Sequence, residues 1–206
     1  MSGLIGRKIG MTQLFSAGNA LVPVTLLEAG PCVVTQIKTK DSDGYTAIQL
    51  GFLEKKAAKT TKPMAGHFAK SKATPMRVVR EFRVPDASGF QLGQTLKADL
   101  FAAGDYVKIT GTTKGKGTAG VVKRHKFHGG PATHGQTDRT RRAGAISSGS
   151  TPGRVYPGKK MAGHMGDQQF SLRRVRIERV DADKNLIIIK GQIPGASNGF
   201  VTIHKK

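Results

Sequence analysis

An internal segment, from Val107 to Gly166, constrains the fold more than any other feature of this sequence. It carries twelve Lys and Arg residues against one acid, Asp138, a balance of +11 in a chain whose formal net charge is +21. It also holds 13 of the 27 glycines. Its few large apolar residues cannot offset the entropy lost when so many glycines are ordered. We therefore expect this segment to lack a core of its own and to be ordered by a partner.

The sequence on both sides of this segment has the pattern of many short strands separated by turn residues, which is typical of an antiparallel barrel or sandwich. Leu172 and Val180 break the alternation of their strand, which suggests a bulge. We predict a mainly β fold, an antiparallel β-barrel with a long basic, glycine-rich internal extension and short helices. The expected strands cover residues 2–15, 20–29, 32–38, 45–52, 76–84, 105–110, 171–180, 185–190 and 200–204.

Two stretches outside the basic segment favour helix. Residues 57–72 are rich in Lys and Ala, and Pro63 stands where a helix could begin, so we expect a helical excursion from the barrel there. Residues 95–103 are expected to form a short helix that ends before Gly104. The predicted organisation is a barrel domain formed by residues 1–110 and 167–206, with residues 111–166 as an extended loop that penetrates RNA.

The basic excess predicts a polyanionic partner, either nucleic acid or an anionic membrane surface. No stretch approaches the roughly 18 apolar residues of a membrane span, and the first residues lack the apolar region of a signal peptide. The single Cys32 cannot form an intramolecular disulfide, so we expect a cytosolic protein that binds no membrane. Nucleic acid is the better partner, because Arg forks onto phosphates and glycine lets the backbone approach RNA closely.

The candidate RNA-binding residues are the basic, histidine and serine side chains of the extension. A solvated face or a charged tail is the alternative interpretation. The segment is internal, however, and Gly-Pro and Pro-Gly pairs interrupt it and define its shape, which favours ordered contact with RNA. The candidates are Lys114, Lys116, Lys123, Arg124, His125, Lys126, His128, His134, Arg139, Arg141, Arg142, Ser148, Ser150, Arg154, Lys159, Lys160 and His164.

Other kinds of site are disfavoured by spacing. Residues 115–120 match the dinucleotide fingerprint G-x-G-x-x-G, but no apolar strand ending in an acid follows, because Asp138 is flanked by Thr and Arg. The four histidines of the extension have no zinc-site spacing. The serines lack an identifiable base, and no pair of carboxylates is available for acid–base chemistry. We therefore expect no cofactor, no metal and no enzymatic activity.

Several long blocks carry a family resemblance. MSGLIGRKIGMTQLF, ITGTTKGKGTAGVVKRHKFHGGPATHG and STPGRVYPGKKMAGHMG resemble the bacterial branch of the ribosomal protein L3 family, and the resemblance runs along nearly the whole chain. It implies a barrel on the outer face of the large ribosomal subunit and an extension that approaches the peptidyl-transferase centre. It also implies binding to large-subunit rRNA near its 3′ end, early in assembly, beside neighbouring large-subunit proteins, without catalysis.

The resemblance carries further expectations onto this chain. The extension corresponds to residues 111–166, with its tip near residues 144–153. Some relatives have a methylated glutamine near the tip, whereas this chain has AISSGSTPG there. Substitutions affecting antibiotics of the peptidyl-transferase centre would fall within residues 143–151. We expect a cytoplasmic ribosomal protein that is not a homo-oligomer; the alternative is a free RNA-binding chaperone that is not stably part of the ribosome.

Overall fold

The computed structural model describes residues 3–16 and 18–205. The chain divides into two compact units, and the second is inserted in the sequence of the first. The barrel unit comprises the described residues up to Thr112 and from Gln169 onward, and the extension unit comprises Thr113–Gln168. Among the described residues, no helix is long and apolar enough to cross a membrane.

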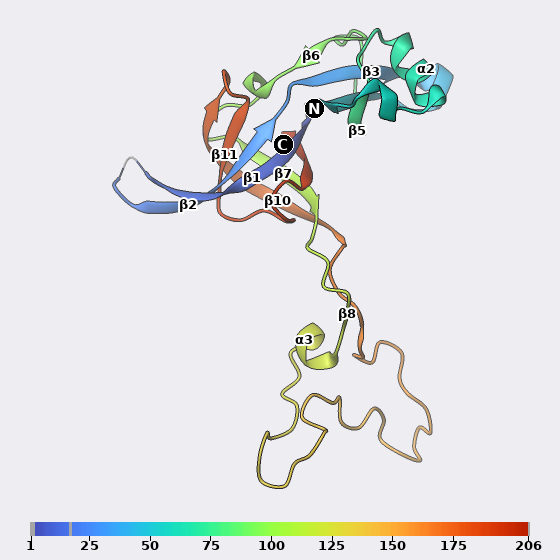
Figure 1. Ribbon diagram of the computed structural model, residues 1–206, viewed down its shortest axis with the longest axis vertical. Coiled ribbons are helices and arrows are strands. Elements are labelled where there is room, and N and C mark those ends of the chain that lie inside the picture. The colour runs from blue at the N-terminus through green and yellow to red at the C-terminus, as the bar shows by residue number, and fades with distance from the viewer. Residues whose placement is uncertain (1–2, 17, 206) are drawn as a thin grey trace. The chain divides into compact units, whose positions relative to one another are not determined.

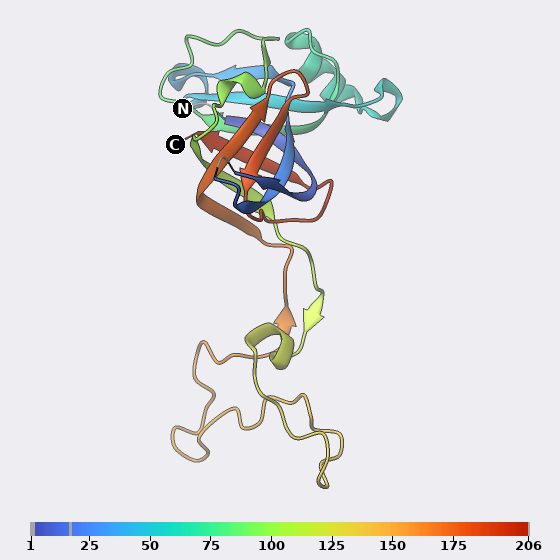
Figure 2. The same cartoon turned by 90° about the vertical axis from the view of Figure 1, so that its left-hand side faces the viewer.

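Six antiparallel strands of the barrel unit close into a barrel (Figures 1 and 2). The predicted mainly β barrel is thereby confirmed. Two of the neighbours, β7 and β10, pair with each other although the whole extension unit separates them in sequence. The strands follow one another around the barrel in the order β1 (Gly3–Phe15), β12 (Phe200–Lys205), β7 (Tyr106–Thr112), β10 (Gln169–Asp181), β11 (Leu186–Lys190) and β2 (Leu21–Ala29).

Alternation along each strand places one apolar row inside the barrel. Leu4, Ile203 and Ile109 are consecutive partners across β1, β12 and β7, and none of the three is exposed to solvent. On the opposite side, Ile187 of β11 is the partner of Leu27 of β2, and both are fully buried. β-Branched and leucine side chains therefore fill the barrel interior, and the outward positions are left for other contacts.

Four further strands form a separate sheet, in the order β5 (Met76–Arg83), β4 (Ala47–Glu54), β3 (Cys32–Lys38) and β6 (Thr95–Leu96). This division of the strands between a barrel and a sheet was not predicted. Ile48, Leu50 and Phe52 of β4 are almost completely buried, in one hydrophobic cluster with the barrel strands. The sheet and the barrel therefore share a single core.

The prediction of a short helix over residues 95–103 was wrong. Thr95 and Leu96 pair with Val33 and Cys32 instead, and only Ala98–Leu100 makes a short 3-10 turn, η2. Leu96 and Ala98 are buried two residues apart, as on one face of an extended chain, and Phe101 is buried after the 3-10 turn. Pairing with β3 and burial of these side chains override the local helix propensity.

The remaining helices are short. Residues 57–72 contain a 3-10 turn, η1 (Ala57–Lys59), and helix α2 (Lys62–Lys70), with Pro63 in its first turn. The turn expected after β3 includes a one-turn helix, α1 (Lys40–Asp43), closed by Gly44 in the left-handed conformation. The bulge predicted in β10 is confirmed, because the register with β7 shifts between Leu172 and Val175.

The reactivity of the Cys32 thiol tests whether this core is packed as described. Its thiol donates a hydrogen bond to the carbonyl of Ile5 at 3.4 Å, and burial raises the pKa of Cys32 to about 12. At pH 8 the folded protein therefore holds roughly a thousandfold less thiolate than the unfolded chain. We expect a thiol reagent to label the native protein at least hundredfold more slowly than the urea-unfolded protein. Equal labelling rates in native buffer would contradict this packing.

Candidate nucleic-acid interface

The extension unit begins as a narrow antiparallel neck. The backbone N–H of Thr113 donates to the carbonyl of Gln168 at 2.9 Å, and that of Lys116 donates to the carbonyl of Met165 at 2.9 Å. The neck ends in two short paired strands, β8 (Thr118–Ala119) and β9 (Gly163–His164). These backbone bonds align the two arms of the extension without requiring a hydrophobic core.

A five-residue helix, α3 (Val121–His125), follows the neck and holds the returning arm. Nη1 of Arg124 donates to the carbonyl of Met161 at 2.9 Å, and Nε2 of His125 lies 3.1 Å from the same oxygen. Val121, the first residue of α3, is buried. Two of the predicted RNA-binding residues thus contact the extension's own backbone, a role that their charge and spacing did not indicate.

Glycines permit the close backbone approaches within this unit. Gly166 has a φ of +78°, and a Cβ there would collide with the carbonyl oxygen of Lys114. Gly129 has a φ of +74°, and a Cβ there would collide with the carbonyl oxygen of Thr140. Only glycine combines these left-handed conformations with contacts of this kind. The glycine content is therefore partly structural, in addition to leaving backbone open to a ligand.

Beyond α3, the described residues 126–162 form neither helix nor strand. This part of the extension borders an open hollow of about 580 Å³, which we call the extension cavity. Four predicted RNA-binding cations line the cavity, and no Asp or Glu does. The aromatic ring of Phe127 and the backbone of three glycines complete the wall. The lining cations are Lys126, Arg139, Arg142 and Lys160, joined by His125 and His128.

The other candidates lie elsewhere on the extension, and most are exposed. Lys114 and Lys116 lie on the neck, His164 lies on β9, and Lys123 lies on α3. The rest lie on irregular chain outside the cavity lining. These are His134, Arg141, Ser148, Ser150, Arg154 and Lys159.

Acidic groups barely reduce the positive charge of this surface. Asp138 lies 3.6 Å from Nη2 of Arg142, and both side chains are more than 60% exposed. An exposed pair of this kind contributes little, so Arg142 stays available to a phosphate. The arrangement can bind polyanions through several cations at once, and its exposed glycines add backbone donors.

Sequence reasoning missed two contributors to this interface. Phe127 is half-buried in the cavity wall, and its ring lies 6.2 Å from that of His125. Gln136 packs against Gly130, where its Nε2 would lie 2.9 Å from an added Cβ. The isolated aromatic residue in an otherwise apolar-poor stretch was the only available signal for Phe127.

The structure of residues 115–120 does not fit a dinucleotide-binding loop, although their sequence matches the fingerprint. Within residues 115–120, Thr118 and Ala119 form β8, which pairs antiparallel with β9, and α3 after it has only five residues. A Rossmann unit instead requires a parallel βαβ crossover with a long helix. Separately, no group of three or more His, Cys, Asp or Glu among the described residues is placed to hold a metal ion.

Comparison with known proteins shows which family the chain belongs to. The family model described as ribosomal protein L3 matches residues 77–185, a span that contains β7, the entire extension unit and β10. The chain belongs to the ribosomal protein L3 family. Large ribosomal subunit protein uL3 of Herpetosiphon aurantiacus is 48% identical to it over 205 residues, covering 100% of this chain and 96% of that protein.

Two further uL3 proteins agree in length and similarity. Large ribosomal subunit protein uL3 of Crocosphaera subtropica is 50% identical over 202 residues, covering 98% of this chain and 95% of that protein. The Corynebacterium diphtheriae protein of the same name is 49% identical over 203 residues, covering 98% of this chain and 93% of that protein. The resemblance recognised from the sequence blocks is confirmed over the whole length of this L3-family chain.

The neck of this L3-family extension offers a local test. We expect Gly166→Ala to break the backbone pairing of Lys116 and Met165, because the methyl group collides with the Lys114 carbonyl. Amide hydrogen exchange of Lys116 and Met165 should accelerate at least tenfold, while barrel amides keep their protection. Gly158→Ala is the matched control, since Gly158 has a similar φ of +77° and open space around it. Equal exchange in the two variants would exclude the steric explanation.

Proposed function

We propose that this chain is a structural constituent of the large ribosomal subunit, binds large-subunit rRNA near its 3′ end, and nucleates early assembly. In this proposal the extension unit reaches toward the peptidyl-transferase centre and supports its RNA. The protein acts on the cytoplasmic ribosome beside neighbouring large-subunit proteins and takes no part in the chemistry. Family membership supports the subunit, and the composition of the extension supports the RNA contact.

One observation supports the RNA-binding role above the others. Four cations line the extension cavity without an acid in its lining, on a unit held by hydrogen bonds rather than by an apolar core. A surface of this kind gains its stable arrangement from a polyanion that threads between the cations. Arg139 and Arg142 can each fork onto a phosphate, whereas Lys126 and Lys160 act as point charges.

Sedimentation tests the proposed location. The protein should sediment with the large subunit at one copy per particle, and it should remain after a high-salt wash. A protein that washes off completely and accumulates in the soluble pool would instead fit a free RNA-binding chaperone. That result would overturn the proposal.

Salt dependence tests the phosphate contacts. We expect the triple variant Arg139→Gln, Arg141→Gln, Arg142→Gln to bind large-subunit rRNA more weakly. Its plot of log affinity against log salt should be less steep by about 2–3, because each neutralised phosphate contributes about 0.7–0.9. Filter binding at a series of salt concentrations measures this slope.

The control for this variant removes equal charge from the barrel unit. Arg179, Lys184 and Lys190 are exposed on β10, on the following turn and on β11, and all three are changed to Gln. This control should leave the slope closer to that of the unmodified protein. An unchanged slope in the extension variant would mean that these arginines do not contact phosphates.

A further inference from the structure

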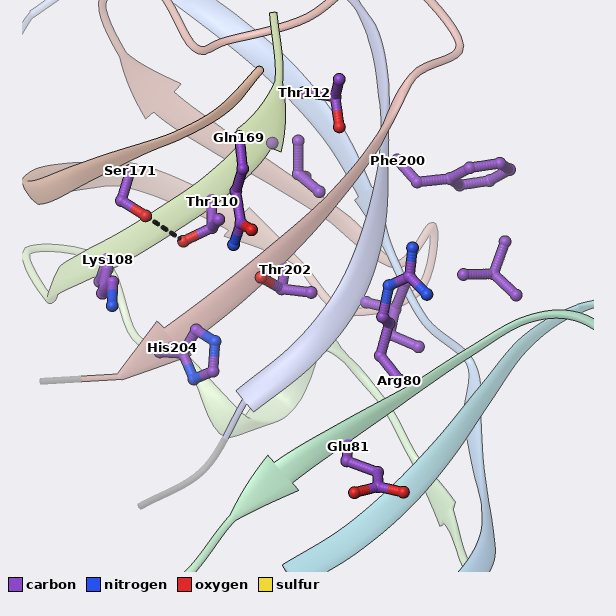
Figure 3. A pocket seen from close by; sticks show the side chains of 14 residues that line it. Arg80, Glu81, Lys108, Thr110, Thr112, Gln169, Ser171, Phe200, Thr202 and His204 are labelled. Carbon is purple, nitrogen blue, oxygen red and sulfur yellow. Dashed lines mark hydrogen bonds between the residues drawn. The ribbon is translucent and has the colours of Figure 1, made fainter. Parts of the chain in front are cut away.

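A second polar hollow lies on the barrel unit itself. It has a volume of about 440 Å³, and Figure 3 shows it from close by. Its floor is the outward face of β12, β7 and β10, and strand β5 contributes Val78, Arg80 and Glu81 to its wall. We call it the hydroxyl groove, and every residue that lines it belongs to the barrel unit.

The floor is a row of hydroxyl groups in register. Thr110 of β7 is the direct partner of Thr202 on β12 and of Ser171 on β10, so the three side chains stand side by side on one face. The Thr110 and Ser171 hydroxyls are 2.7 Å apart and hydrogen-bonded to each other. Thr112 and Gln169, the next registered pair on the same face, extend the polar floor. Three hydroxyls at successive strands form a line that offers both donors and acceptors.

The charge at the rim is positive. Lys108 lies at the rim beside its strand partner His204, and Arg80 reaches in from β5 (Figure 3). Glu81 is the only acid in the lining, and it is already engaged by Lys38 at 2.9 Å and by the Tyr45 hydroxyl at 2.8 Å. The groove therefore presents two cations without an opposing free carboxylate.

His204 adds a neutral polar ring at the same rim. Burial, and to a smaller extent the charge of Lys108, holds the pKa of His204 below its usual range. The ring packs against Phe82 with the centroids 4.9 Å apart. A neutral imidazole has one donor nitrogen and one acceptor nitrogen, so it suits a hydroxyl-bearing ligand better than a second phosphate.

Chain connectivity links the groove to the extension. Thr112 and Gln169 line the groove, and the chain passes directly from Thr112 into the extension unit and returns at Gln169. Lys114 is two residues from Thr112, a separation of at most roughly 7 Å along the chain.

We propose that the hydroxyl groove binds the ribose–phosphate backbone of RNA, with the Thr202, Thr110 and Ser171 row hydrogen-bonded to 2′-hydroxyl and phosphate oxygens. Lys108 and Arg80 neutralise the phosphates. The inference rests on the proposed rRNA-binding function and adds a site on the barrel that selects RNA over DNA. Ser and Thr hydroxyls are common ligands of the sugar and phosphate, and only RNA supplies the 2′-hydroxyl.

The test removes the hydroxyls and leaves the charges in place. The full-length variant Thr110→Val, Ser171→Ala, Thr202→Val is compared with the unmodified protein for binding to a transcript of the 3′ part of large-subunit rRNA. We expect about tenfold to hundredfold weaker binding, because three hydrogen bonds are lost. The salt slope should not change, because no charge is lost. Affinity for single-stranded DNA of the same sequence should fall less, because DNA offers the row phosphate oxygens but no 2′-hydroxyl.

Lys108→Gln is the complementary variant. It should weaken RNA binding and reduce the steepness of the salt plot by about 0.7–0.9. Thr12→Val and Lys190→Gln, at exposed positions of the barrel unit outside the groove, are the matched controls and should bind as the unmodified protein does. If the triple variant does not fold, as judged by circular dichroism, Lys108→Gln and the single variant Thr202→Val decide the question.

The outcomes separate this inference from the proposed function. If the groove variants bind RNA normally while the extension variant Arg139→Gln, Arg141→Gln, Arg142→Gln binds weakly, the groove proposal is overturned and the rRNA-binding proposal stands. If both sets bind normally, the proposed function fails as well. Equal losses for RNA and DNA in the triple variant would also overturn the groove proposal, because they would remove the role of the 2′-hydroxyl.

Discussion

Replacing residues 137–153 with a two-residue glycine linker is expected to abolish stable incorporation into the large subunit and to leave the barrel unit folded. These residues form no helix or strand, and the fully buried core residues all lie in the barrel unit. The change removes Arg139 and Arg142 from the extension cavity. Because loop-closure entropy varies slowly with loop length, the shorter connection costs the barrel little.

Two measurements on this deletion variant separate folding from function. The thermal midpoint of the barrel should stay within a few degrees of the unmodified protein, and the occupancy of salt-washed large subunits should fall from one copy to near zero. The control replaces the same residues with a Gly/Ser linker of equal length, which keeps the reach but not the arginines. A globally unfolded deletion variant, or full occupancy, would contradict this division of labour between the units.

Ile109→Ala should have the largest effect on stability. Ile109 is fully buried at the centre of the barrel row, between Ile203 and Leu172 on the adjacent strands. Truncating such a side chain costs about 2–5 kcal/mol, because apolar contacts are lost and a cavity remains. That is a large share of the roughly 5–15 kcal/mol by which domains are usually stable.

Urea unfolding measures this effect. The midpoint should fall while the dependence of the unfolding free energy on urea stays the same, since the area exposed on unfolding changes little. Ile146→Ala is the control, because Ile146 is 46% exposed on the extension and should change stability by less than about 0.5 kcal/mol. A loss below about 1 kcal/mol for Ile109→Ala would mean that the barrel interior is packed loosely at this position.

Local pattern was sufficient to predict most strands of the barrel. Alternation in residues 105–110 and 200–204 reflects one buried face and one outward face, and the broken alternation at Leu172 marked a real bulge. The separate sheet escaped prediction because strand partners are chosen by long-range packing, which a single strand's pattern does not contain. The helix predicted for residues 95–103 was wrong for the same reason, because the pairing of Thr95 with Val33 in the sheet decides the conformation there.

The types of residue in the candidate interface could be predicted from the sequence, but their arrangement in space could not. Charge and glycine content pointed to the extension, but the grouping of Lys126, Arg139, Arg142 and Lys160 depends on left-handed glycines such as Gly129. The hydroxyl groove was missed because Thr110, Ser171 and Thr202 become neighbours only through the strand register. Sequence spacing gives no sign of that row.

The central claim is that the extension unit contacts the RNA of the subunit interior. A crosslinking map of residues 139–160 in salt-washed large subunits tests it most directly, with photoreactive groups introduced at single positions. We expect crosslinks to large-subunit rRNA nucleotides around the peptidyl-transferase centre. Crosslinks confined to surface rRNA, or adducts with protein alone, would contradict the account.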